Sequence, residues 1–333
     1  PQETDELFEQ LLLLKKNDHT IIFISHKIRE VMQICDNITV IRAGRTVGSI
    51  PVANATEEDI SRFMVGRDVI LKMNKKPAEF GDTLLKVTDL TYENKEGRKL
   101  LDHVSFSLKK GQILGIAGVE GNGQNELAEA IFGFYSGVKG SILFDGKEIL
   151  GKSIRAIRDD GISYIPEDRI KTGAAGNISL WGNMIADIID SPLLKKHGLL
   201  NYKNIHERAD KLISDFGVLC QNDDQPIGML SGGNMQKVVV AREFSSDPKL
   251  LIANQPTRGI DVGANEFIWK KIIEQRDAGK GVILISADLN EIMELSDSIL
   301  VMCGGQAAAY FEDTKKVDEF ELGNYMLGLK HQE

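Results

Sequence analysis

Residues 118–125 have the glycine spacing of a phosphate-binding loop, but not its usual catalytic side chains. In the pattern G-x-x-x-x-G-K-[ST], backbone N–H groups surround phosphate oxygens, the Lys neutralises charge and the hydroxyl holds Mg²⁺. Here Gln124 replaces the Lys and Asn125 replaces the hydroxyl residue. We expect a nucleotide site that keeps its shape and has lost catalysis, formed by Gly118, Gly121, Asn122, Gly123, Gln124, Asn125 and Glu126.

A second group of positions that are catalytic in P-loop enzymes follows the short apolar segment 249–253. That segment predicts a buried parallel strand. In active P-loop enzymes this strand ends in an Asp that supports Mg²⁺ and, in many, a Glu that orients water. Asn254 and Gln255 take these places, and an amide has no negative charge and cannot act as a base near neutral pH. A plain strand-end turn is the alternative, but the flanking sequence PTRGID favours a degenerate catalytic position.

The segment LSGGNMQK at 230–237 combines Ser231, Gly232 and Gly233 with a following helix that includes Gln236. This arrangement predicts an anion-binding helix N-terminus. The alternative is a glycine-rich turn that only caps a helix. The position downstream of a phosphate loop and just ahead of a buried strand favours the anion-binding interpretation.

Residues 20–48 and 281–309 are two copies of one pattern, related by a constant offset of 261 residues. Each copy has an apolar strand, a polar tip, a helix, an Asp and a second strand, which is typical of a parallel α/β sheet. His26 of the first copy corresponds to Ala287 of the second. A helix should precede each copy, at roughly 2–16 and 264–278.

The repeat divides the chain into parts of two similar domains. We expect a C-terminal remnant of a first nucleotide-binding domain at 1–65, a linker at 66–84 and a second domain at 85–333. In the second domain we expect strands at 85–92, 102–108 and 112–117, a helix at 126–132, a hairpin at 141–149 and a helix at 200–217. The order strand, glycine-rich loop and helix is the context that a phosphate loop requires.

The bulk composition restricts the partners. A net charge of -9 and a pI near 5.3 argue against general nucleic-acid binding. No apolar run reaches the length of a membrane span. Cys35, Cys220 and Cys303 lie far apart without C-x-x-C spacing, which favours buried, reduced thiols over disulfides or a metal site. The chain starts Pro-Gln-Glu, which resembles the middle of a longer protein.

These motifs together resemble the ATP-binding subunit of an ABC transporter, of the tandem type that serves simple-sugar and nucleoside importers. LSGGNMQK matches the family signature, and GISYIPEDR at 161–169 is similar to the Q-loop segment, with Glu167 where many members have Gln. PTRGIDVGA at 256–264 resembles the D-loop region. The GNGQ loop and the NQPTRG segment most resemble the nucleoside-import branch.

The resemblance implies an α/β P-loop fold of the ABC type. A parallel core sheet should carry an antiparallel β-subdomain (about 85–117 and 140–149) and a helical subdomain (about 170–232). In the family, two domains pair head to tail, and each ATP lies between one phosphate loop and the other domain's signature. By analogy, Ser231, Gly232 and Gly233 complete the first domain's site together with His26.

The same resemblance sets the remaining expectations. ATP is the implied cofactor, with Mg²⁺ weak or absent at the degenerate site marked by Asn254, Gln255 and Ala287. Tyr92 is either the residue that stacks on adenine or a tyrosine of the sheet edge. Implied partners are a first nucleotide-binding domain, two membrane permeases and, indirectly, a substrate-binding protein, but no nucleic acid.

These partners imply a peripheral location at the cytoplasmic face of the cell membrane. An apolar stripe within 178–188 is either permease-facing or core. The alternatives are a non-hydrolysing regulatory partner domain and a soluble ABC ATPase that acts on DNA or ribosomes.

Overall fold

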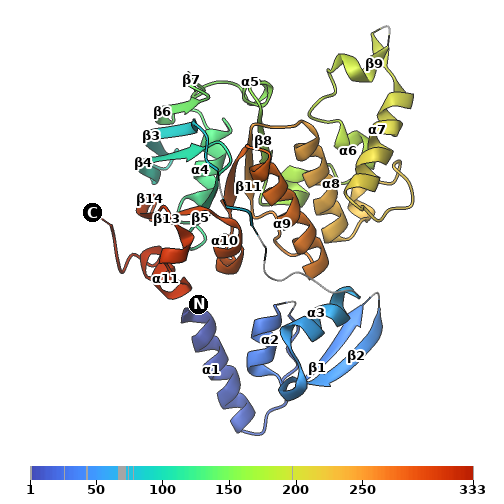
Figure 1. Ribbon diagram of the computed structural model, residues 1–333, viewed down its shortest axis with the longest axis vertical. Coiled ribbons are helices and arrows are strands. Elements are labelled where there is room, and N and C mark those ends of the chain that lie inside the picture. The colour runs from blue at the N-terminus through green and yellow to red at the C-terminus, as the bar shows by residue number, and fades with distance from the viewer. Residues whose placement is uncertain are drawn as a thin grey trace. The chain divides into compact units, whose positions relative to one another are not determined.

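The structure is a computed structural model that describes residues 2–25, 27–42, 44–66, 73, 75–77, 79–196 and 198–332 (Figure 1). It separates into one unit of Pro1–Met73 with Asp261–Phe267, and a second of Asn74–Ile260 with Ile268–Glu333. Within the expected linker 66–84, residues 67–72, 74 and 78 lie outside the described residues. None of the described helices combines the length and apolar character that a membrane span requires.

The first unit is a small α/β assembly around its own core. Its elements are α1 (Gln2–Lys16), α2 (Ile28–Ile34), β1 (Asn37–Arg42), β2 (Arg45–Pro51), η1 (Val52–Asn54) and α3 (Glu57–Val65). Ile28, Val31, Ile38, Val40 and Ile60 form the buried cluster. Thr56 and Asp59 form a reciprocal capping box that fixes the start of α3.

The predicted repeat is confirmed by element positions. In the second unit, α10 (Leu289–Leu295), β13 (Ser298–Cys303) and β14 (Gln306–Phe311) start at the same offset from α2, β1 and β2. The apolar strand expected at the start of the first copy is wrong, because residues 20–25 form no strand and Ile22 and Ile24 are 88% and 93% exposed. Its counterpart β12 (Gly281–Ile285) pairs with parallel strands on both sides, whereas β1 and β2 pair only with each other among the described residues.

The second unit contains a six-stranded sheet in the order β14-β13-β5-β12-β11-β8. The strands not yet bounded are β5 (Ile113–Ala117), β8 (Ile162–Ile165) and β11 (Leu250–Asn254), all fully buried. Every pairing is parallel except β13 with β14. Such continuous apolar strands are typical of a parallel sheet covered on both faces. The helices around it are α4 (Gln124–Ile131), α5 (Ile154–Asp159), α8 (Gly232–Ser245), α9 (Val262–Asp277), α10 and α11 (Glu319–Met326) (Figure 1).

A separate antiparallel sheet has the order β4-β3-β6-β7. It consists of β3 (Thr83–Glu93), β4 (Lys99–Lys109), β6 (Lys139–Phe144) and β7 (Lys147–Glu148). The predicted hairpin turn is confirmed at Asp145 and Gly146, whose φ angles of 48° and 78° are left-handed. The assignment of residues up to 117 to this sheet is wrong, because β5 pairs with β12 and β13 in the core sheet.

The expected helical region contains helices and one unexpected hairpin. It holds the π-helix η2 (Arg169–Gly173), α6 (Leu180–Met184), η3 (Pro192–Leu194), the hairpin β9 (Lys195–Lys196) and β10 (Leu199–Leu200), α7 (Tyr202–Asp215) and η4 (Ile227–Met229). Leu180 and Met184 are fully buried, so this part of the apolar stripe is core, while Ile178 is 49% exposed.

The three cysteines are free and half-buried rather than buried as expected.

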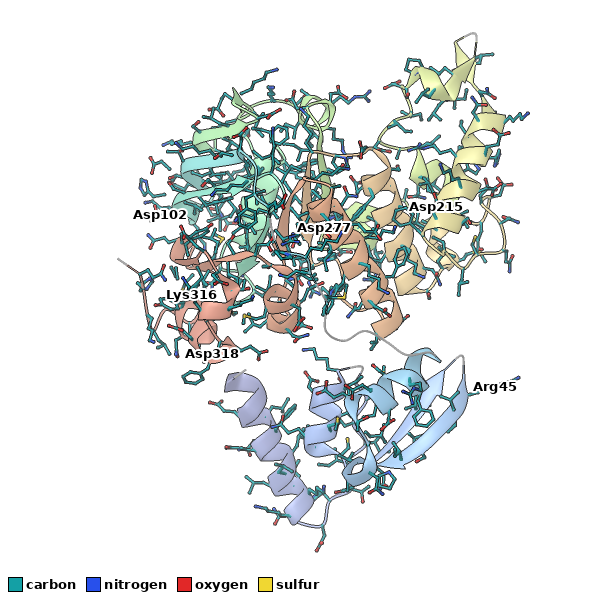
Figure 2. All side chains as sticks on the ribbon, viewed as in Figure 1. Arg45, Asp102, Asp215, Asp277, Lys316 and Asp318 are labelled. Carbon is teal, nitrogen blue, oxygen red and sulfur yellow. The ribbon has the colours of Figure 1, made fainter. Side chains whose placement is uncertain are left out.

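A buried ion pair connects the ends of three elements in the second unit. Arg276, at the end of α9, donates through Nε and Nη2 to the two carboxylate oxygens of Asp297, each at 2.9 Å. Asp297 also accepts from the backbone N–H of Ile113 at the start of β5 (2.9 Å). Arg276 Nη1 donates to Asp277, which is labelled in Figure 2. The side chains of Arg276 and Asp297 are only 3% and 7% exposed.

Replacing Asp297 by Ala should lower the free energy of unfolding of the second unit by about 3 kcal/mol or more, because it leaves a buried guanidinium short of anions. Urea unfolding followed by tryptophan fluorescence measures this, since Trp181 and Trp269 both lie in this unit. Glu207→Ala removes an exposed helical ion pair with Lys203 and should cost less than about 1 kcal/mol. Equal losses for the two variants would contradict the structural role of Asp297.

Candidate functional site

The glycine-rich loop connects β5 to α4, so the predicted order of strand, loop and helix is confirmed. The helix begins at Gln124, two residues before the expected start. Gly121 and Gly123 have left-handed φ angles of 87° and 103°. A Cβ atom at Gly123 would lie 2.8 Å from the carbonyl oxygen of Leu100, so the loop needs glycine here for conformation and for space.

Gln124 turns back over its own loop. The residue is 7% exposed, and its side-chain Nε2 donates to the carbonyl oxygen of Val119 (3.1 Å). A Cβ at Gly118 would lie only 2.1 Å from this Nε2 atom. The position that carries a cation in active loops is therefore a neutral donor that holds the loop closed.

Asn122 anchors the loop from behind. Its Oδ1 accepts from the N–H of Gly304 (3.1 Å), and its Nδ2 donates to the carbonyl of Met326 (3.2 Å). These bonds fix the loop to the β13–β14 turn and to the end of α11. Both ends of the amide are used within the protein, so Asn122 shapes the loop. Glu126 lies half-buried in the first turn of α4.

Asn125 and Asn254 are bonded to each other. Asn254 is 1% exposed, and its Nδ2 donates to Asn125 Oδ1 (2.8 Å) and, at 3.4 Å, to the hydroxyl of Tyr164. Asn125 in turn donates through Nδ2 to the carboxylate of Glu167. The structure thus brings together three expected site positions from the loop, β11 and the segment after β8. They form a chain of amides that ends in one carboxylate.

As a donor set for Mg²⁺ these groups fit poorly. Mg²⁺ prefers near-octahedral oxygen ligands and is held in P-loop sites by a hydroxyl and an Asp. Asn125 instead presents an NH₂ group to Glu167, whose other oxygen accepts from Arg258. Asn254 Oδ1 is buried and has no hydrogen-bond partner among the described residues, which leaves one neutral acceptor.

The PEDR and PTRG motifs are joined in space. The guanidinium of Arg258 pairs with Glu167 and lies 3.9 Å from a carboxylate oxygen of Glu120 in the loop. Arg169 donates to the carbonyl oxygens of Arg258 (2.6 Å) and Gly259 (3.3 Å). Sequence reasoning identified both motifs, but it did not predict that they form one network.

Gln255 links the end of β11 to the end of β12. It has a left-handed φ of 50°, and its N–H donates to the carbonyl of Ile285 (2.8 Å). Its side-chain Oε1 accepts from the N–H of Ala287 (3.1 Å). Two expected degenerate positions are therefore in contact, and Gln255 there acts as a clamp between loops.

Glu291 was missed by the sequence analysis. It is fully buried on α10, and it accepts from the hydroxyl of Thr257 (2.9 Å to each oxygen), the indole N–H of Trp269 (2.7 Å) and Ser286. Burial raises the pKa of Glu291 to about 7, and the three donors oppose that rise. The repeat could have indicated this site, because Ser25 and Glu30 of the first copy correspond to Ser286 and Glu291. Ser25 donates to Glu30 there as well (3.1 Å).

The signature segment begins α8. The exposed Ser231 is the N-cap, and its Oγ accepts from the side-chain Nδ2 of Asn234 (3.0 Å) and from the N–H of that residue. A Cβ at Gly232 would lie 2.6 Å from Arg169 Nη2, so a larger residue there would displace the end of the Arg169 side chain. Gln236 is 2% exposed and donates to the carbonyl of Pro256 (2.8 Å), so it connects α8 to the end of β11.

Two expected site residues remain, Tyr92 and His26. Tyr92 stacks on Tyr135 with ring centroids 4.4 Å apart, so one face of its ring is covered. Burial raises the pKa of Tyr135, whose hydroxyl donates to Glu129. His26 lies outside the described residues.

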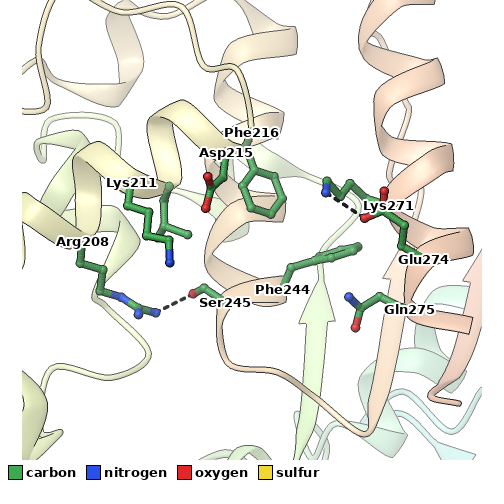
Figure 3. A pocket seen from close by; sticks show the side chains of 10 residues that line it. Arg208, Lys211, Asp215, Phe216, Phe244, Ser245, Lys271, Glu274 and Gln275 are labelled. Atoms are coloured by element: carbon green, nitrogen blue, oxygen red, sulfur yellow. Dashed lines mark hydrogen bonds and ion pairs between the residues drawn. The ribbon is translucent and has the colours of Figure 1, made fainter. Parts of the chain in front are cut away.

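Two other features are separate from this network. One is a cavity of about 300 Å³ that none of the loop residues lines, and Figure 3 shows the side chains around it. It is lined by Arg208, Lys211, Leu212, Asp215, Phe216, Phe244, Ser245, Lys271, Glu274 and Gln275. His206, Asp223 and Asp224 form a cluster with metal-ligand chemistry, but His206 pairs with Asp223 (2.5 Å) and Trp181 donates to Asp224 (3.0 Å).

Comparison with known proteins agrees with this geometry. Residues 101–258 match the family model described as ABC transporter. A solved nucleotide-free ATP-binding cassette from an ABC transporter superposes with a TM-score of 0.62 at 26% identity, covering 73% of this chain and 99% of that one. The chain therefore has the fold of ABC-type ATP-binding cassettes.

Two curated relatives with similar sequences are ATP-binding proteins of import systems. The chain is 39% identical over its full length to the guanosine import ATP-binding protein NupO of Bacillus subtilis. It is 38% identical over 98% of its length to the glucose import ATP-binding protein TsgD13 of Haloferax volcanii. The chain spans 65% and 60% of these two relatives. It is thus similar to ATP-binding proteins of nucleoside and sugar importers.

Glu291→Gln should change how stability depends on pH. The folded-state pKa of Glu291 lies above its ordinary value of 4.5, so the folded protein retains a proton that the unfolded chain releases. The free energy of unfolding of the native protein should therefore fall between about pH 4.5 and 7, by up to about 3 kcal/mol. The neutral Gln should remove this contribution. Urea unfolding of both proteins from pH 4.5 to 8 tests it, and parallel curves would contradict it.

Proposed function

We propose that the chain is part of the ATP-binding component of an ABC importer, which couples ATP binding and hydrolysis to uptake of a simple sugar or a nucleoside. The signature helix with its Ser231 cap and the similarity to NupO and TsgD13 support this proposal. A nucleoside is the preferred cargo, because the GNGQ and NQPTRG segments most resemble that branch.

Within this component, the loop at 118–125 is a degenerate ATP site. The hydrogen bond between Asn125 and Asn254 carries this proposal, because it satisfies with two neutral amides the positions that hold Mg²⁺ in active sites. The bond from Ala287 to Gln255 supports it, since the position of the base is occupied by an amide in a structural contact. Mg²⁺ is accordingly weak or absent here, and Tyr92 is the candidate adenine partner.

The signature serves a different site. Ser231, Gly232 and Gly233 contact ATP held by a first nucleotide-binding domain, where His26 contributes a hydrogen-bond donor. Two membrane permeases are the further partners, with a substrate-binding protein acting through them and no nucleic acid. The chain then works as a peripheral protein at the cytoplasmic face of the membrane. Co-purification with permeases supports this assembly, whereas co-purification with DNA or ribosomes would favour a soluble ABC ATPase.

The isolated chain should hydrolyse ATP negligibly. Loss of one electrostatic or base contribution commonly costs about 10²-fold or more in rate, and here Gln124, Asn254, Gln255 and Ala287 each lack one. Steady-state phosphate release by the purified chain is the measurement. Turnover at an ordinary ATPase rate that Gln124→Ala abolishes would defeat the proposal. Addition of the first-domain portion distinguishes a purely regulatory pair, which stays inactive, from an importer ATPase, which gains activity.

In the full-length protein, Ser231→Arg should abolish ATP hydrolysis, because it places charge and bulk at the N-terminus of α8 where γ-phosphate is bound. Gln124→Ala should be tolerated, because Gln124 supplies no cation and loses only its bond to Val119, worth about 1 kcal/mol of stability. ATPase rates at matched folded fractions decide between them. If Gln124→Ala is as damaging as Ser231→Arg, the loop at 118–125 is catalytic and the asymmetric account is wrong.

A further inference from the structure

Arg258 lies beside the phosphate loop between two carboxylates, and it pairs closely with only one of them. One guanidinium nitrogen pairs with Glu167, whose side chain is 21% exposed and is also held by Asn125. Another lies 3.9 Å from Glu120, a loop residue whose side chain is 79% exposed. Contacts of the second kind contribute little in water. Glu167 therefore fixes Arg258 in place, while Glu120 is easily displaced.

The loop requires positive charge from some source if it binds a polyphosphate. In active sites that charge comes from the loop Lys and from Mg²⁺. Here Gln124 is neutral, and Asn125 and Asn254 bond to each other. Among the described side chains with printed contacts to residues 118–125 or to Glu167, Arg258 is the cation. Its guanidinium has a planar fork of donors that suits phosphate oxygens and never loses its charge at physiological pH.

We propose that Arg258 takes the place of the metal ion and the Lys at this loop, so that a nucleoside triphosphate binds here without a divalent cation. On binding, the phosphate displaces Glu120 from Arg258, while Glu167 stays paired and keeps the guanidinium oriented. The proposal rests on the proposed function, which puts a nucleotide at 118–125. It adds the residue that neutralises the phosphates and the residue that competes with them.

The test measures binding of a fluorescent N-methylanthraniloyl ATP analogue to the purified chain, in excess MgCl₂ and in EDTA. The native chain should bind with dissociation constants in the two buffers that agree within about threefold, and Arg258→Ala should weaken binding at least about tenfold in both. Glu120→Gln should strengthen binding by about threefold, because it removes the competing anion.

A matched control restores the metal ligands. The double variant Asn125→Ser with Asn254→Asp should bind the analogue at least about tenfold more tightly in MgCl₂ than in EDTA. Thermal melting of each variant without nucleotide separates lost binding from lost folding. Arg258→Lys keeps the charge but not the planar fork of donors, so its dissociation constant should lie between those of the native chain and Arg258→Ala.

The outcomes separate this inference from the proposed function. Binding by the native chain that requires MgCl₂, or that is unchanged by Arg258→Ala in a folded protein, overturns the role of Arg258 and leaves the nucleotide site standing. Failure of Glu120→Gln to strengthen binding overturns the exchange of Glu120 for phosphate. No binding by the folded native chain in either buffer overturns both the nucleotide site and this inference.

Discussion

The hydrogen bond between Asn125 and Asn254 is the constraint on which the rest of the site depends. It joins the phosphate loop to the end of β11 with two neutral groups, where an active enzyme holds a metal ion between a hydroxyl and a carboxylate. Because Asn254 is almost completely buried, the bond is protected from water and would be costly to leave unmade. Glu167 and Arg258 then extend the chain of contacts to the surface of the loop.

The segment 255–259 transmits this arrangement to the other functional loops. It accepts from Ala287 at the end of β12, from Gln236 on the signature helix and from Arg169 after β8, and it donates to the buried Glu291. Each contact is local and ordinary in strength, but together they fix four elements to one another. A site without catalytic side chains can thus hold the signature segment in a defined position, which is the role we propose for this domain.

The sequence predicted features with short-range causes. The glycines of the loop and the turn at Asp145 follow from local spacing, the repeat follows from the matching local patterns of its two copies, and all three were confirmed. Long-range pairings could not be predicted, because the Glu167–Arg258 pair joins residues whose proximity depends on the parallel order of β8 and β11. The strand expected at the start of the first copy of the repeat was wrong for the complementary reason, since an apolar segment becomes a strand only beside neighbouring strands.

The central claim is that one site hydrolyses ATP and the other holds it unchanged, and the fate of bound nucleotide in the full-length protein tests it most directly. The protein is loaded with radiolabelled ATP and MgCl₂, trapped in the closed state with vanadate, separated from free nucleotide and quenched in acid. The account predicts that trapped ADP comes from one site per pair of domains, and that any nucleotide at the loop 118–125 is recovered as ATP. Recovery of two ADP per pair of domains would contradict it.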